Sequence, residues 1–257
     1  MGQARRARIG LGVAIALVLA FGQLGAPETA RADHPEPSGL PDLVMLPPTD
    51  FSIQKRPKGT RWLRFDTVVV NLGPGPFDVV GRQDAADPIG TLDVFQRIAT
   101  DTSGSAWAEH ATPAHMSYSG DGHNHWHVIG LQEWTLTNDR AEVLARGAKT
   151  GFCFWDNYRY GTSAPAHYLP STTSACIRRA DGTVPMGLSS RWGDEYPSNI
   201  AFQYIDISHL PNGVYTLVLK ADTQSAFMEG NEGNNTSWAR IRIERRGVTV
   251  LEQSAAP

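Results

Sequence analysis

The alternation of apolar and polar residues in the last third of the chain limits the fold most strongly. Apolar side chains recur at every second position in two segments, namely Tyr215, Leu217, Leu219 and Ala221, then Ala239, Ile241 and Ile243. Successive side chains of a strand point to opposite faces, so each segment is predicted to be a strand with one buried face. After residue 32 no long stripe has the 3.6-residue period of an amphipathic helix. We therefore predict a mostly β fold, with a sandwich-like antiparallel core, long loops and little helix.

Further strands are expected along the chain. Residues 62–72 are rich in Val, Phe, Leu and Trp and run into Gly73-Pro74-Gly75-Pro76, which predicts a strand followed by a turn. Other strands are predicted near residues 40–44, 77–80, 92–97, 123–137, 152–155 and 205–207. The rest of residues 84–117 and the segment 158–186 are assigned to loops.

Three histidines, His123, His125 and His127, occupy alternate positions. In an extended strand they share one face, whereas a helix would scatter them. Imidazole is the commonest ligand for zinc and copper, and a bound cation keeps three neighbouring imidazoles from repelling one another as imidazolium ions. A solvated, histidine-rich strand edge is the alternative. The spacing favours a Zn(II) or Cu(II) site with a position left for water or substrate, and it does not choose the metal.

The first 32 residues have the order of a cleaved secretory signal. An arginine-rich start precedes an apolar run over residues 9–24, and a small-residue triplet follows at 30–32. The run is short for a bilayer span. We expect cleavage near Asp33, export, and no stable membrane insertion afterwards. Residues 33–257 then form a single domain with a core over about residues 40–246.

The charge and the cysteine content indicate which partners and which cellular compartment to expect. The formal net charge is −3 and there is no basic block, so a nucleic-acid partner is not expected. Cys153 and Cys176 are the two cysteines of the chain. In an oxidising compartment they are predicted to form one disulfide, worth about 3 kcal/mol.

Four separated motifs resemble the catalytic domain of the lysyl oxidase family. In chain order they are the histidine triplet, Gly147-Ala148-Lys149-Thr150-Gly151-Phe152-Cys153, Gly193-Asp194-Glu195-Tyr196 and Gln203-Tyr204-Ile205-Asp206-Ile207. As in the family pattern, a tyrosine, Tyr196, lies seven residues before the glutamine. The resemblance extends over about residues 40–243.

The resemblance implies an exported, copper-dependent amine oxidase. His123, His125 and His127 would bind Cu²⁺, and Lys149 and Tyr196 would form the cofactor lysyl tyrosylquinone. With O₂, such an enzyme converts primary amines, peptidyl lysine among them, to aldehydes and releases ammonia and hydrogen peroxide. A lysine with a pKa near 10.4 is almost wholly protonated in water, so we expect Lys149 to be desolvated before the crosslink forms.

Amine oxidation also needs a carboxylate that removes a proton from the substrate. Asp194, two residues before Tyr196, is the first candidate for this catalytic base. Glu195 and Asp156 are alternatives, and a solvated turn residue is the simpler interpretation of all three.

An oxygen-rich segment, residues 229–235, resembles the family's calcium loop. The implied Ca²⁺ ligands are Asp42, the Leu43 carbonyl, Glu229, Asn231, Asn234 and Asn235. Asn231 stands where the family has an aspartate, so one charge is missing. A polar hairpin loop is the alternative.

The chain departs from the family pattern in two other ways. Trp134 stands where the family has a histidine seven residues after the triplet, and one disulfide replaces the several of animal members. Two other functions fit the sequence. One is a non-enzymatic Ig-like metal-binding or adhesion module, since the last third also fits Ig-like repeats. The other is a zinc hydrolase, which needs no quinone.

Overall fold

Strands dominate the part of the chain that the computed structural model describes, which is residues 39–84, 90–100, 106–118 and 124–257. All strand pairs there are antiparallel, and the helical elements are a 3-10 turn at Pro57–Gly59 (η1) and one α-helical turn at Pro170–Thr173 (α1). The prediction of a mostly β fold is confirmed. The predicted signal segment lies outside the described residues.

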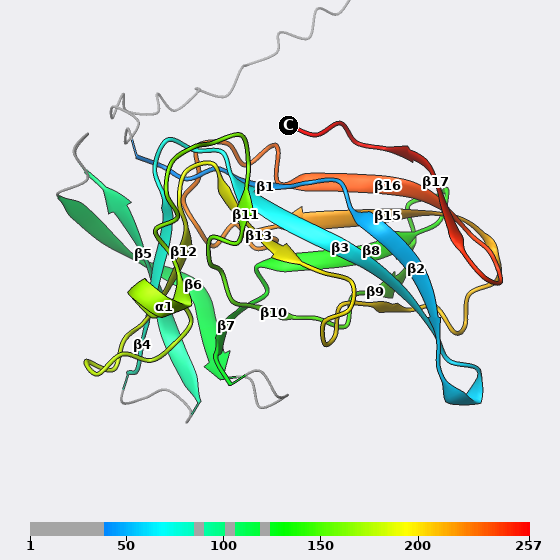
Figure 1. Ribbon diagram of the computed structural model, residues 1–257, viewed down its shortest axis with the longest axis horizontal. Coiled ribbons are helices and arrows are strands. Elements are labelled where there is room, and N and C mark those ends of the chain that lie inside the picture. Colours follow the sequence, from blue (N-terminus) through cyan, green and yellow to red (C-terminus); the bar gives the residue numbers. More distant parts are fainter. Residues whose placement is uncertain (1–38, 85–89, 101–105, 119–123) are drawn as a thin grey trace, which may run out of the picture. The chain divides into compact units, whose positions relative to one another are not determined.

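The strands form three sheets (Figure 1). The first contains β1 (Leu43–Met45), β2 (Thr49–Lys55), β3 (Arg61–Asn71), β11 (Tyr158–Arg159), β13 (Trp192–Tyr196) and β14 (Ile205–Asp206). The second contains β4 (Phe77–Arg82), β5 (Thr91–Ala99), β6 (Trp107–Tyr118), β7 (Trp126–Ile129), β10 (Gly151–Phe152) and β12 (Val184–Leu188). The third contains β8 (Gln132–Thr137), β9 (Val143–Arg146), β15 (Gly213–Ala221), β16 (Thr236–Ile243) and β17 (Val248–Gln253).

The order of strands follows from these pairings. The first sheet runs β1-β3-β13-β11, and β2 and β14 also pair with β3. The second runs β10-β7-β6-β5-β4-β12 and the third β17-β16-β15-β8-β9. In the third sheet β15 and β16 bury every second side chain, as their alternating sequence predicts.

A row of aromatic rings joins the three sheets in one core. Phe65 on β3 meets Trp134 on β8 edge to face, with ring centres 5.3 Å apart. Trp134 contacts Phe152 on β10 at 5.8 Å, and Phe152 contacts Tyr196 on β13 at 5.3 Å. Such edge-to-face pairs add to the free energy gained by burial alone. The row ends at Tyr196, so the core also fixes that residue.

Several local predictions differ from the structure. Strand β6 lies in a segment predicted to be mostly loop, because many of its side chains are exposed and give no alternating signal. The predicted loop at 158–186 contains β11, α1 and most of β12. Strand β17 pairs with β16, so the sheet continues past residue 246.

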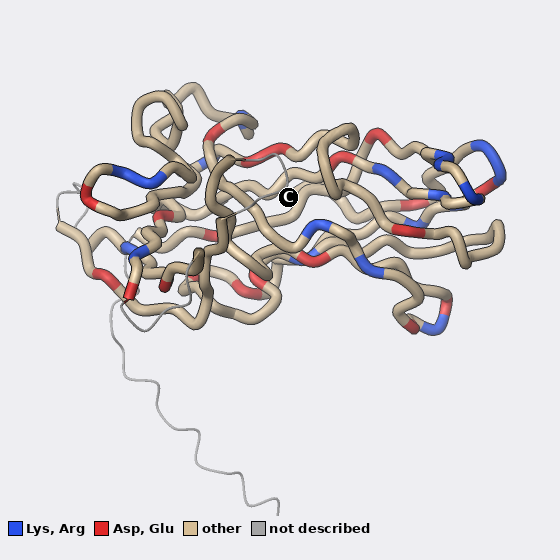
Figure 2. Tube along the Cα trace, turned by 90° about the horizontal axis from the view of Figure 1, so that it is seen from below, with Lys and Arg blue, Asp and Glu red and all other residues tan. Residues whose placement is uncertain are grey.

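Two further features bear on the predictions. Cys153 and Cys176 form the predicted disulfide, with their Cα atoms 5.7 Å apart. Within the described ranges, no helix is long and apolar enough to cross a membrane. In Figure 2 the acidic and basic residues of these ranges are interspersed along the chain.

Candidate active site

Backbone hydrogen bonds to Trp134 and Tyr204 fix the segment that leads into Lys149. Gly147, just after β9, donates its N–H to the Trp134 carbonyl at 2.8 Å, and Ala148 donates to the Tyr204 carbonyl at 2.9 Å. A Cβ on Gly147 would lie 2.6 Å from Cε3 of Trp134. Because glycine has no Cβ, the segment passes close to the indole ring.

Lys149 lies against two aromatic rings. Its Nζ is 4.9 Å from the ring centre of Tyr196 and 5.4 Å from that of Phe152, and the residue is 7% exposed. Aromatic faces attract a cationic nitrogen, and the surrounding rings exclude water. The lysine and the tyrosine singled out by the sequence are therefore neighbours in a desolvated site.

The hydroxyl of Tyr196 is fixed by the backbone of one residue. It donates to the Cys153 carbonyl at 2.6 Å and accepts the Cys153 N–H at 2.8 Å. Burial raises the pKa of Tyr196 well above its usual range, and the nearby Asp194 raises it further. The phenol is thus neutral and held in one orientation.

The disulfide links this tyrosine to the histidine segment. Cys153 anchors Tyr196, and its partner Cys176 accepts the N–H of Trp126 at 2.9 Å. Trp126 lies between His125 and His127 in the sequence. The disulfide and this backbone hydrogen bond together connect the segment that holds the phenol to the segment that carries the imidazoles.

Two of the three histidines lie in the described residues. His127 is on β7 and is 5% exposed, and His125 lies in the bend just before β7. Their ring centres are 4.6 Å apart. His123 is outside the described residues. The argument that all three share a strand face needs correction for His125, because β7 begins at Trp126.

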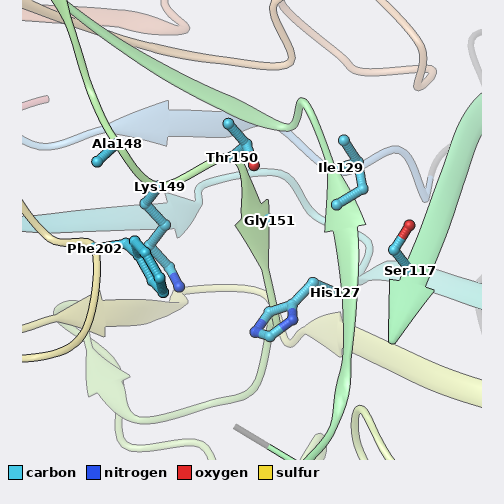
Figure 3. Close-up of a pocket in the computed structure, with 8 residues that line it drawn as sticks. All are labelled: Ser117, His127, Ile129, Ala148, Lys149, Thr150, Gly151 and Phe202. Carbon is cyan, nitrogen blue, oxygen red and sulfur yellow. The ribbon is translucent and has the colours of Figure 1, made fainter. Parts of the chain in front are cut away.

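Two cavities are lined by His127. One, of about 360 Å³, is lined in part by His125, His127, Asp194 and Tyr196. The other, of about 250 Å³, is lined in part by His127 and Lys149, with Phe202 on its wall (Figure 3). His127 lines both cavities, so it lies between the lysine and tyrosine sides of the site.

Asp194 is the most deeply buried carboxyl group of this region, at 1% exposed. Its Oδ1 accepts a hydrogen bond from Asn157 Nδ2 at 2.7 Å. Burial raises the pKa of Asp194 well above its usual range, and interactions with Tyr196, Asn157 and Lys149 oppose the increase. Burial therefore makes the neutral form of this carboxyl group more favourable than it is in water.

The two other candidate carboxylates have different surroundings. Asp156 is buried, and its Oδ2 accepts hydrogen bonds from the backbone of His167 and Tyr168 and from the Ser189 hydroxyl. This carboxylate is fully used in joining loops. Glu195 lines the larger cavity and is only partly buried.

A comparison with known families agrees with this geometry. The family model described as lysyl oxidase matches residues 92–252, which is more than half of the chain. The chain belongs to the lysyl oxidase family. It is thus an oxidoreductase of the lysyl oxidase type, with an amine as substrate and O₂ as oxidant in general. No curated protein sequence gives a significant match.

In this member of the lysyl oxidase family the oxygen-rich loop packs against the first strand. Glu229 accepts the Leu43 N–H through Oε2 at 2.5 Å and the Asn235 Nδ2 through Oε1 at 2.9 Å. Asn234 Nδ2 donates to Asp42 Oδ2 at 3.1 Å. Five of the six residues that the resemblance names as calcium ligands are thus brought together.

The sixth residue of that set, Asn231, behaves differently. It is exposed, and its Oδ1 accepts the N–H of Gly233 at 3.0 Å, so it stabilises the loop itself. Burial raises the pKa of Glu229 to about 8, and the neighbouring carboxylates of Glu232 and Asp222 add to this.

Sequence reasoning missed three polar residues near these sites. Asn157, which bonds to Asp194, lies between the strand predicted at 152–155 and the loop predicted at 158–186, and it belongs to no motif. Asp222 and Glu232 each place a carboxylate oxygen within 4.8 Å of Glu229. Glu232 lies inside the oxygen-rich loop, so its place in the sequence could have identified it as a possible ion ligand.

Proposed function

We propose that this lysyl oxidase family member is an exported, copper-dependent amine oxidase with lysyl tyrosylquinone as cofactor. It would convert primary amines to aldehydes and release ammonia and hydrogen peroxide. The observation that carries the proposal is the buried contact between the Lys149 amine and the Tyr196 ring beside the histidine segment. Contacts between cations and aromatic rings are common, so this one supports the proposal because the sequence motifs single out the same two residues independently.

We propose His123, His125 and His127 as the copper ligands. Two imidazoles that share an ion through bonds of about 2 Å have ring centres within about 6 Å of each other. The 4.6 Å between His125 and His127 satisfies this, and neutral imidazoles without a thiolate suit Cu(II). When bound, copper supplies the O₂-dependent oxidation that makes the quinone cofactor from Tyr196 and Lys149, and that cofactor supplies the amine oxidation.

The protein contributes orientation and exclusion of water. The Tyr196 hydroxyl accepts the Cys153 N–H and donates to the Cys153 carbonyl, so one edge of the ring is fixed while the lysine approaches another part of it. Phe152 packs edge-on against Tyr196 and lies near the Lys149 amine. The amine is thereby confined near the ring and away from bulk water.

We propose Asp194 as the catalytic base. It lines the same cavity as Tyr196, and its raised pKa suits a group that takes a proton from the α-carbon of a bound amine. Asn157 fixes one carboxyl oxygen, which leaves the other for the substrate proton. The hydrogen-bond set of Asp156 makes it a poorer base, because each new role would break bonds that join loops.

Export and calcium binding are further parts of the proposal. Residues 1–32 have the sequence pattern of a cleaved signal, and a disulfide is most stable in an oxidising compartment. We also propose that Ca²⁺ binds through oxygen atoms of Asp42, Glu229, Asn234 and Asn235 and through the Leu43 carbonyl. The hydrogen bonds among these residues support the proposal, because they hold the loop against the first strand.

Peptide mapping of copper-matured protein tests the central step. The expected product is a crosslinked pair of peptides containing Lys149 and Tyr196, with one oxygen more and four hydrogens fewer than the two peptides together. Lys149→Arg should abolish both the crosslink and amine-dependent peroxide release, because the guanidinium does not replace the amine. Lys220→Arg, an exposed lysine on β15, is the matched control and should retain both.

The same measurements separate the alternative functions. Copper-loaded protein without the crosslink and without peroxide release from alkylamines would contradict the oxidase and favour a metal-binding module. Hydrolysis by zinc-loaded Lys149→Arg protein would favour a hydrolase.

A further inference from the structure

A group of three carboxylates lies where the end of β15 meets the oxygen-rich loop. Asp222, Glu229 and Glu232 each place an oxygen within 4.8 Å of the others. Glu229 belongs to the calcium-loop pattern, whereas Asp222 and Glu232 do not. Asp222 is buried, Glu229 is partly buried and Glu232 is exposed. The neighbouring carboxylates contribute to the raised pKa of Glu229, so a cation among the three would favour their ionised forms and stabilise the folded chain.

Unused oxygen atoms beside these carboxylates are an independent sign of a ligand. Asn235 is 2% exposed, and its Nδ2 donates to Glu229, yet its Oδ1 has no hydrogen-bond partner in the described part of the chain. The same holds for Oδ1 of Asp42 and of Asn234, which bond to each other through their other atoms. Buried oxygens nearly always have a partner, and a metal ion is one kind of partner.

The charge missing at Asn231 has a replacement one residue later. Asn231 uses its Oδ1 to accept the Gly233 N–H. The adjacent Glu232 carboxylate makes no hydrogen bond to any residue that the structure describes, and it lies within reach of Glu229. Asp222 accepts the N–H groups of Ala226 and Phe227, one on each oxygen, which leaves lone pairs available.

We propose that Ca²⁺ binds here through a ligand set particular to this chain, in which Glu232 and Asp222 supply the negative charge that Asn231 lacks. The inference rests on the calcium site proposed above and names its chemistry. It does not depend on the quinone or on copper. Ca²⁺ fits because six or more oxygen ligands, carboxylate and amide alike, are available, and because Mg²⁺ demands a stricter octahedral geometry.

The first test uses the full-length chain, freed of metal by a chelator, and compares its melting temperature with and without added divalent cations. Addition of CaCl₂ should raise the melting temperature, whereas MgCl₂ should have a smaller effect. By calorimetry, Glu232→Gln should bind Ca²⁺ about tenfold more weakly, because one ligand charge is lost. Glu252→Gln changes an exposed glutamate on β17 and is the matched control, so this variant should bind Ca²⁺ like the wild type.

A compensating change makes the test sharper. Asn231→Asp in the Glu232→Gln background should restore most of the lost Ca²⁺ affinity, because it returns the charge to the neighbouring position. Asp222→Asn should also weaken binding, with circular dichroism used to check that the variant is folded.

The outcomes separate this inference from the one on which it rests. No Ca²⁺ binding by the wild type would overturn the calcium site and this inference together. Wild-type affinity in Glu232→Gln, or an equal loss in Glu252→Gln, would overturn the inference while leaving a calcium site in place. Failure of Asn231→Asp to restore affinity would overturn the claim that Glu232 supplies the charge missing at position 231.

Discussion

The pocket around Tyr196 and the carboxylate group around Glu229 both bury polar atoms, but they satisfy them in different ways. In the pocket the Tyr196 hydroxyl both donates to and accepts from Cys153, and Asn157 bonds to Asp194. Beside Glu229 three side-chain oxygens have no hydrogen-bond partner among the described residues. In the pocket one oxygen, Oδ2 of Asp194, also has no hydrogen-bond partner in the described part of the chain. The proposed reaction uses that oxygen, whereas the three oxygens beside Glu229 have a role only when an ion binds.

This difference indicates separate roles for the two sites. A preorganised pocket suits chemistry, because its groups need no rearrangement when a reactant arrives. A cluster of carboxylates that repel one another suits an ion with a structural role, because ion binding favours the folded state alone. The two sites should therefore respond independently to substitution.

The largest expected effect is the loss of activity in Asp194→Asn. Removal of the proposed base should lower kcat for amine oxidation by about 10²–10⁴-fold, because an amide does not accept the substrate proton. The crosslink should still form, since Lys149 and Tyr196 are unchanged, and calcium should stabilise the variant as it does the wild type. Peroxide release, peptide mapping and melting with CaCl₂ measure the three properties. Undiminished kcat in this variant would move the role of base to Glu195.

The disulfide gives the next largest effect. Cys153→Ser combined with Cys176→Ser should lower the free energy of unfolding by about 3 kcal/mol, because the unfolded chain regains freedom. The yield of the Lys149–Tyr196 crosslink should fall as well, since Cys153 anchors Tyr196 and Cys176 holds the histidine segment. Denaturant titration and peptide mapping test this.

Calcium binding by Asp222, Glu229 and Glu232 should be unchanged in the disulfide variant. The increase in melting temperature caused by calcium should persist, because the hydrogen bonds that hold Glu229 come from Leu43 and Asn235 and not from the bridge. Loss of the calcium response together with the crosslink would show that the two sites are coupled, and the comparison would then fail.

Local sequence pattern predicted the strands that have one buried and one exposed face. The alternation at Tyr215–Ala221 predicted β15 because burial follows the two-residue period there. Strand β6 was missed because neither of its faces is consistently buried, so its residues give no periodic signal. The strand is stabilised by backbone pairing with its neighbours β5 and β7, and backbone hydrogen bonds leave no periodic pattern in the sequence.

The candidate site shows the same limit. The motifs identified Lys149 and Tyr196, and the structure brings them together. The partners that tune the site, such as Asn157 and the backbone of Cys153, act through contacts made only after folding. Asp222 and Glu232 were missed for a similar reason, because the family pattern directed attention to Asn231.

The smallest expected effect is a shift in the pH dependence of activity when Asn157 is replaced by Ala. Asp194 must be ionised to accept a proton, so activity is present above its pKa and is lost as the pH falls through it. The pKa of Asp194 is already raised by burial, and the Asn157 amide favours the ionised form. Removal of this hydrogen bond should move the acid limb of the kcat profile upward by about one pH unit, because a hydrogen bond to a charged group contributes about 1.5 kcal/mol. Asn138→Ala, which removes comparable turn bonds after β8, is the control and should leave the limb in place, since Asn138 bonds only within its own turn. A profile that falls uniformly at all pH values would mean that Asn157 supports the fold and does not tune Asp194.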